Sequence, residues 1–187
     1  LVYMSVVSTL YFYTDPILWS SGNQMTADSI RIRLKNKNID RLYMVGNSFV
    51  ASQDSLKNFN QIKGRNMTTS FKGNSINNVL VEGNAESIYY VLEEKELDLD
   101  SMRAKLIITM GMNKMICSKM RIIFKDGKVN TANAYVKPDA QFIPPQEIKE
   151  ADRKLKGFEW REERRPSRDQ VVKRSRNEIP DKKIVKD

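Results

Sequence analysis

Histidine is absent from the chain, and cysteine occurs once, as Cys117, among 187 residues. Without histidine, Ser-His-Asp and Cys-His catalytic arrangements and imidazole-based metal sites are excluded. One cysteine cannot form an internal disulfide, which suits the cytoplasm or a periplasmic protein and argues against a small secreted disulfide scaffold. Cys117 follows Ile116 at an inward-facing strand position, so we interpret it as a small buried hydrophobe. We predict no enzymatic activity and no cofactor or metal.

Long apolar runs and glycine-rich loops are also lacking. No run approaches the roughly 18 residues that a membrane-spanning helix needs. The carboxylates in residues 93–100 lack a glycine-turned calcium loop, so we interpret this stretch as an exposed, solvated loop. Leu1 is not a methionine, and the residues after it lack the basic region of a signal peptide. We therefore expect the chain to start inside a longer protein.

The net charge of +9 would suit a phosphate-bearing partner. The excess of lysine and arginine is divided between the body of the chain and its last 40 or so residues, so neither part is a basic block. Nucleic-acid binding rests only on this net charge and on a basic cluster at residues 161–176. We predict no nucleic-acid partner.

A pattern of strand, turn and strand occurs three times along the chain. Each copy has a short alternating run, then a four-residue polar turn that begins with lysine, then a second run that opens on an aliphatic residue. Gly, Asn and Asp in these turns favour hairpins. The first runs and their turns are residues 30–34 with 35–38, 67–71 with 72–75, and 120–124 with 125–128.

Side-chain alternation within the copies predicts which residues face inward. Ile30, Ile32 and Leu34 share one face of a strand, whereas Arg31 and Arg33 lie on the other. In each second run the apolar residues are spaced by three and then by two, which predicts a β-bulge shortly after each turn.

A second, glycine-containing motif follows the first two copies. We interpret Gly46-Asn47 and Gly83-Asn84 as turns between hairpins, with Lys137-Pro138-Asp139 in that place in the third copy. The whole body, residues 1–143, is thus predicted to be one all-β domain.

The composition changes after Pro144-Pro145, and we predict a charged tail over residues 144–187. Ile148, Ala151 and Leu155 have helical spacing, so a short amphipathic helix is expected over residues 146–156. Beyond Trp160 the density of charge predicts disorder.

The inward-facing residues form the candidate binding site. They could fill a closed core, or they could line an open apolar trough that takes up a lipid; the nine methionines favour the adaptable trough slightly. The predicted apolar interior consists of Ile30, Ile32, Leu34, Ile39, Leu42, Met44, Met67, Phe71, Ile76, Val79, Val81, Ile122 and Phe124.

The motifs together resemble the OstA-like domain of the lipopolysaccharide-transport proteins of the LptA, LptC and LptD amino-terminal type. The family pattern is an Ala-Asp strand, a basic turn, an Ile-x-x-Ile/Leu strand and a Gly-Asn turn. The resemblance covers about residues 8–143 and is strongest to the longer OstA-like proteins of Bacteroides-type bacteria. It is carried by residues 25–30, 39–42, 46–47, 64–68 and 83–85.

This resemblance implies an elongated, twisted antiparallel β-jellyroll, open along one edge, with acyl chains of lipopolysaccharide in its interior. It implies a periplasmic location, with association with the outer membrane as a further option. The implied partners are lipopolysaccharide or lipid A, and other transport proteins or further copies of the chain, joined through edge strands. The alternative is a structural assembly protein of the cell envelope that binds protein partners through its β edges and basic tail.

Overall fold

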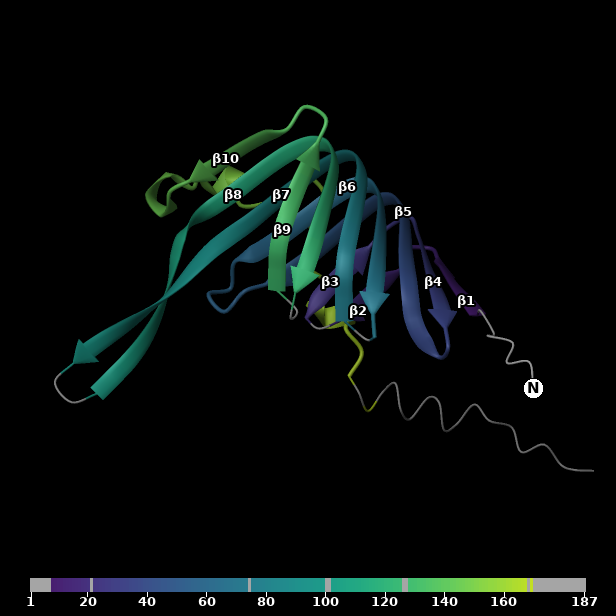
Figure 1. Ribbon diagram of the computed structural model, residues 1–187, viewed down its shortest axis with the longest axis horizontal. Helices are drawn as coiled ribbons and strands as arrows, with labels where there is room; N and C mark the ends of the chain where they lie inside the picture. Colours follow the sequence, from purple (N-terminus) through teal and green to yellow (C-terminus); the bar gives the residue numbers. More distant parts are fainter. Residues whose placement is uncertain are drawn as a thin grey trace, which may run out of the picture.

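The computed structural model describes residues 8–20, 22–73, 75–99, 102–125 and 128–167, together with Asp169. Ten strands form one antiparallel sheet, which is open because its path ends at β1 and β10 (Figure 1). The predicted all-β class is confirmed. The strands are β1 (Ser8–Tyr13), β2 (Ile17–Ser20), β3 (Asn23–Thr26), β4 (Ser29–Lys35), β5 (Asn38–Gln53), β6 (Phe59–Lys72), β7 (Ser75–Leu99), β8 (Met102–Lys125), β9 (Lys128–Tyr135) and β10 (Asp139–Ile143).

The hairpin turns lie where the repeats predict them, and they are tighter than expected. Lys35 pairs with Asn38, so only Asn36 and Lys37 form the loop, with φ angles of 51° and 62°. This geometry is typical of the two-residue turn that matches strand twist. The bulges predicted after the turns are confirmed in all three copies, where one residue is skipped in the pairing: Asp40, Asn77 and Asn130.

The Gly-Asn motifs are not turns between strands, which corrects the prediction. Gly46 (φ 74°) and Asn47 (φ 45°) lie inside β5, and Gly83 and Asn84 lie inside β7. The pairing register shifts at both motifs. Glycine and asparagine reach the left-handed region at low cost, so the chain bends there without ending the strand. Lys137-Pro138, by contrast, does separate β9 from β10.

These kinks lie side by side across the sheet and fold it into two arms, as the arching strands in Figure 1 show. Because β5 to β8 pass through the fold line, each contributes to both arms. The first arm contains residues 8–13, 29–35, 38–45, 66–72, 75–82, 119–125 and 128–135. The second arm contains residues 17–20, 23–26, 48–53, 59–64, 85–99, 102–117 and 139–143.

The prediction of an exposed loop over residues 93–100 is also wrong for residues 93–99, and residue 100 lies outside the described residues. β7 continues to Leu99 and pairs with the start of β8, forming a ribbon that projects beyond the sheet (Figure 1). Glu94 lies opposite Ile107, and Lys105 forms an ion pair with Glu94 at 2.6 Å. The charged run becomes a strand because residues 106–109, three of which are β-branched, supply a pairing partner.

The amphipathic helix predicted over residues 146–156 is absent. The chain instead forms two 3₁₀ turns, η1 (Pro145–Glu147) and η2 (Glu150–Asp152), and a third, η3 (Glu162–Arg164), further on. The backbone here is occupied by contacts with the sheet, which compete with helical hydrogen bonds. We name residues 145–165 the C-terminal strap. We predicted disorder beyond Trp160. Residues 161–165 are instead part of the strap, and residues 168 and 170–187 lie outside the described residues.

Candidate functional site

All thirteen residues predicted to form the apolar interior lie in one cluster between the two arms. Eight are buried and pack in its centre: Ile30, Ile32, Leu42, Met44, Met67, Val79, Val81 and Ile122. The other five are partly buried and lie near the hairpin turns of the first arm: Leu34, Ile39, Phe71, Ile76 and Phe124. We use the name apolar interior for the whole cluster.

The second arm contributes residues to the apolar interior that the prediction missed. Met25 and Ala85 are buried in it, as is Ala27 directly after β3, and Val50 and Ile62 pack against it. The prediction ended a strand at each Gly-Asn motif, whereas β5 and β7 continue past these motifs. If the motifs are treated as kinks, the alternation of residues 48–53 places Val50 on the inner face.

The centre of the apolar interior is closed to solvent. Leu42, Val81 and Met120 are all 0% exposed. Cys117 is part of the same cluster, and burial raises the pKa of its thiol above the ordinary value. The thiol therefore stays protonated at neutral pH and packs as a small apolar group.

The apolar interior is open at both lateral edges of the folded sheet. Phe12 and Leu10 of β1 lie opposite Ile30 and Ile32 and so face inward, yet they are 38% and 46% exposed. At the other edge, Phe142 of β10 lies opposite Asn113, on the same face as Met115 of the apolar interior, and is 52% exposed. Inward-facing apolar side chains at each end thus lack a cover.

The opposite, outer face of the second arm is covered by the C-terminal strap. Ala51 of β5 lies opposite Gln24 of β3 on one side and opposite Gln61 of β6 on the other. Both glutamine side chains therefore point to the outer face, in one row across the three strands. The Gln61 side-chain amide donates to the Arg153 carbonyl at 2.7 Å and accepts from the Leu155 N–H at 2.8 Å.

Gln24 binds the strap in the same way farther along. Its amide donates to the Glu159 carbonyl at 2.7 Å, and it accepts from the Arg161 N–H at 2.7 Å. Both glutamines are buried, at 2% and 0% exposure. Each side-chain amide hydrogen-bonds the strap backbone as a neighbouring β-strand would, because it offers one donor and one acceptor.

Aromatic contacts fill the space between these two attachments. Phe158 lies with its ring centre 5.0 Å from that of Phe59, and Trp160 packs edge-on against Trp19 at 5.1 Å. Leu155 joins the same small core at 5% exposure. The strap and the second arm therefore share an apolar core of their own.

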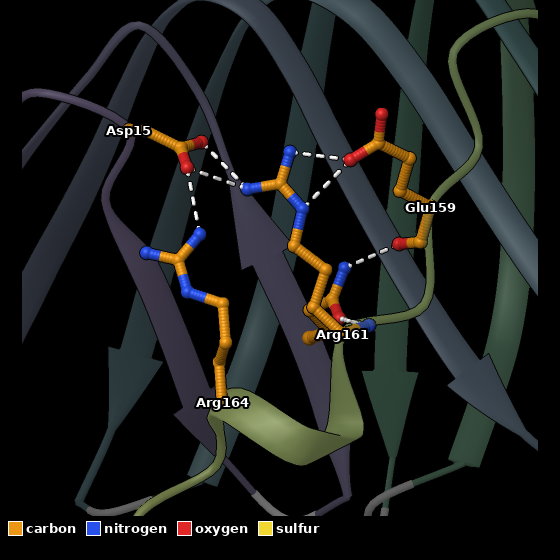
Figure 2. A network of polar contacts seen from close by, with 5 residues as sticks. Asp15, Glu159, Arg161 and Arg164 are labelled. Carbon is orange, nitrogen blue, oxygen red and sulfur yellow. Dashed lines mark hydrogen bonds and ion pairs between the residues drawn. The ribbon is translucent and has the colours of Figure 1, made fainter.

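Ion pairs hold the strap at two places, and Figure 2 shows the network around Arg161 and Arg164. Arg161 and Arg164 bind the Asp15 carboxylate at 2.6 and 2.7 Å, and these hydrogen bonds, from Arg161 first, lower the pKa of Asp15 below its ordinary value. Lys114 binds Asp152 at 2.9 Å and likewise lowers the pKa of that carboxyl.

A polar cleft of about 450 Å³ lies between the strap and the fold line. Its lining carries as many carboxylates as cations, so it has no strong preference for either charge. Lys63 and Glu86 pair within it at 3.3 Å. The cleft lies on the outer side of the second arm, and its lining shares Ala27 with the apolar interior. Its residues are Asp15, Thr26, Ala27, Asp28, Asn47, Phe49, Lys63, Gly64, Arg65, Gly83, Asn84, Glu86, Lys156, Gly157, Glu159 and Arg161.

Within the described part of the chain, no helix has the length and apolar character to cross a membrane. The same residues contain no cluster of three cysteine or carboxylate side chains placed to hold a metal ion. Comparison with protein-family models, curated proteins and solved structures found no match for this chain.

Proposed function

We propose that this chain is a periplasmic lipopolysaccharide-binding and transport component that holds acyl chains along its apolar interior. The observation that carries the proposal is the pair of open edges, where inward-facing Phe12 and Phe142 remain exposed. A lipid chain laid along the interior would cover both ends. Each methylene group removed from water would contribute about 0.8 kcal/mol.

The interior is built from side chains that can rearrange around a lipid. Met25, Met44, Met67 and Met120 lie in the closed centre. Methionine has an unbranched, flexible side chain, so it fills irregular space and changes rotamer around a ligand more easily than a β-branched residue does. In this proposal an acyl chain enters at an open edge and displaces thioethers as it advances.

In this proposal the two arms are the walls of a β-jellyroll, and the fold line is its closed side. Strand β1 at one edge and strand β9 at the other each pair on one side only. Such edges can accept a strand from another transport protein or from a second copy of the chain. Stacked in this way, the interiors would form one continuous path across the envelope.

Site-specific photocrosslinking tests the lipid proposal. A photoreactive residue at Leu34, Phe71 or Phe124 should give an adduct with lipopolysaccharide, because these side chains are at the accessible margin of the interior. The adjacent positions Ser70 and Ile123 are matched controls, since alternation places them on the outer face. Absence of adducts at all three inner positions, or equal adducts at the controls, would overturn the proposal.

A second candidate is a structural assembly protein of the envelope with a permanently closed core. The full burial of Leu42, Val81 and Met120 favours it. In that case a chain ending at residue 167, which keeps the strap, should lose its protein partners in a pull-down. The inner positions should give no lipid adduct. Partner binding that survives the truncation would argue against this candidate.

A further inference from the structure

The two outer faces of the folded sheet differ in what covers them. The outer face of the second arm carries the C-terminal strap, whereas no described segment covers the outer face of the first arm. Side chains on that bare face follow the pairing register in rows. One row runs through Arg31, Tyr43, Thr68, Leu80 and Arg121.

This bare face has an excess of positive charge. Its two carboxylates are already paired, Asp40 with Arg33 and Glu82 with Lys119. Three further arginines, which we name the arginine triad, have no ion pair with any described residue. Four exposed lysines at the hairpin turns of the same arm add to the positive electrostatic potential of this face. The triad is Arg31, Arg41 and Arg121, and the lysines are Lys35, Lys37, Lys72 and Lys125.

Tyrosine and aliphatic side chains stand among these cations. Tyr13 is 67% exposed at one end of the face and Tyr135 42% at the other, with Val45 at 51% between them. Tyrosine suits the boundary between headgroups and acyl chains because one end of it is apolar and the other polar. Cations beside such residues favour an anionic lipid surface.

Three tyrosines on this face, Tyr11, Tyr13 and Tyr43, already have a ring face in contact with another side chain. The Arg31 guanidinium lies 4.2 Å from the centre of the Tyr43 ring and covers it. Tyr11 and Tyr13 are stacked on each other with their rings 4° from parallel. Base stacking needs free ring faces, so these contacts favour lipid headgroups over single-stranded nucleic acid.

We propose that the outer face of the first arm docks on a bilayer rich in anionic phospholipid, with the arginine triad as its main contact. The apolar interior faces the opposite side of the same arm. Membrane docking through this face therefore does not depend on whether the interior takes up a lipid, and either property can fail alone.

Vesicle binding by the full chain tests this surface. Vesicles of phosphatidylcholine and phosphatidylglycerol in equal parts should bind the chain, and pure phosphatidylcholine vesicles should not. The triple variant Arg31→Gln, Arg41→Gln, Arg121→Gln should bind the anionic vesicles about a hundredfold more weakly, at about fivefold for each lost charge. Binding of the unchanged chain should fall steeply as salt rises.

The matched control is the triple variant Lys57→Gln, Lys95→Gln, Lys149→Gln, which loses the same charge from exposed positions on other surfaces. It should bind within about fivefold of the unchanged chain. Thermal unfolding of both variants checks that they are folded. Equal loss in the two variants, equal binding to neutral vesicles, or tighter binding of a single-stranded RNA at the triad would each overturn the proposal.

Discussion

Two buried glutamines show how single side chains can position a segment that has little regular structure. Gln24 and Gln61 each satisfy one carbonyl and one N–H of the strap. Unpaired buried backbone groups are costly, so the strap depends on these amides for its place on the sheet.

Replacement of Gln61 by leucine should lower the free energy of unfolding by about 2–4 kcal/mol. The leucine has a similar volume but leaves the Arg153 carbonyl and the Leu155 N–H without partners. Gln53→Leu is the control, because Gln53 is exposed and its side chain donates only a long 3.5 Å hydrogen bond, to the Lys57 carbonyl. Urea unfolding measures both variants, and similar values for the two would contradict the assigned role.

Attachment of the strap should weaken in acid through Asp15. Arg161 and Arg164 lower the pKa of this carboxyl in the folded chain below its unfolded value near 3.8. The stabilisation is therefore complete above the unfolded pKa and is lost as pH falls through the folded pKa. Unfolding measured from pH 6 down to about pH 2 should show less loss of stability for Asp15→Asn than for the unchanged chain.

The exposed Glu147→Gln variant is the control for this acid series, because Glu147 is in the strap but makes no ion pair with any described residue. Its pH dependence should follow that of the unchanged chain. An Asp15→Asn variant with the same acid sensitivity as the unchanged chain would show that the ion pairs with Asp15 contribute nothing to stability.

At the level of the strand, the fold depends on kinks that bend strands without ending them. Gly46 is the most crowded of these positions. The Asp28 carboxylate lies where a side chain at Gly46 would begin, and the Asp28 N–H donates to the Gly46 carbonyl at 2.9 Å. The crossing from β3 to β4 thus packs directly on the kink of β5.

Substitution of Gly46 by alanine should cost about 3 kcal/mol or more, because both the φ of 74° and the contact with Asp28 oppose a β-carbon. Gly73→Ala is a matched control. Its φ of 63° is similar, but nothing lies within 4 Å of the added carbon. It should cost about 1–2 kcal/mol. Equal costs in denaturant unfolding would mean that contact with Asp28 plays no part.

For the molecule as a whole, the strap and the folded sheet form a single packed unit. The apolar interior holds the arms together from inside, and the second core joins the strap to the outside of the second arm. Because β5 to β8 belong to both arms, separation of the arms would disturb every layer of this packing.

We therefore expect the strap and the sheet to unfold together. The chain has two tryptophans, Trp19 on the sheet and Trp160 on the strap, and they contact each other. Their fluorescence reports detachment of the strap, whereas far-ultraviolet circular dichroism reports the sheet. The two urea transitions should coincide, as for a two-state unit. A fluorescence transition at clearly lower urea would show that the strap detaches first.

Local features of this chain could be predicted from residue order, because strand alternation and turn chemistry act between near neighbours. The hairpins, their bulges and the inward face of the first arm follow from period two and from Asn or Gly at the turns. The thirteen residues of the predicted interior lie together for the same reason. The binding of a lipid there remains a prediction.

Features that depend on distant contacts could not be predicted in this way. Gln24 binds a backbone group 135 residues away, and Gln61 binds one 92 residues away, so neither pairing has a local signal. The Gly-Asn kinks have the composition of turns, and only pairing on both sides of them keeps the strand continuous. The second arm, the projecting ribbon and the strap were therefore decided by long-range packing, which outweighs local propensity wherever it supplies a partner.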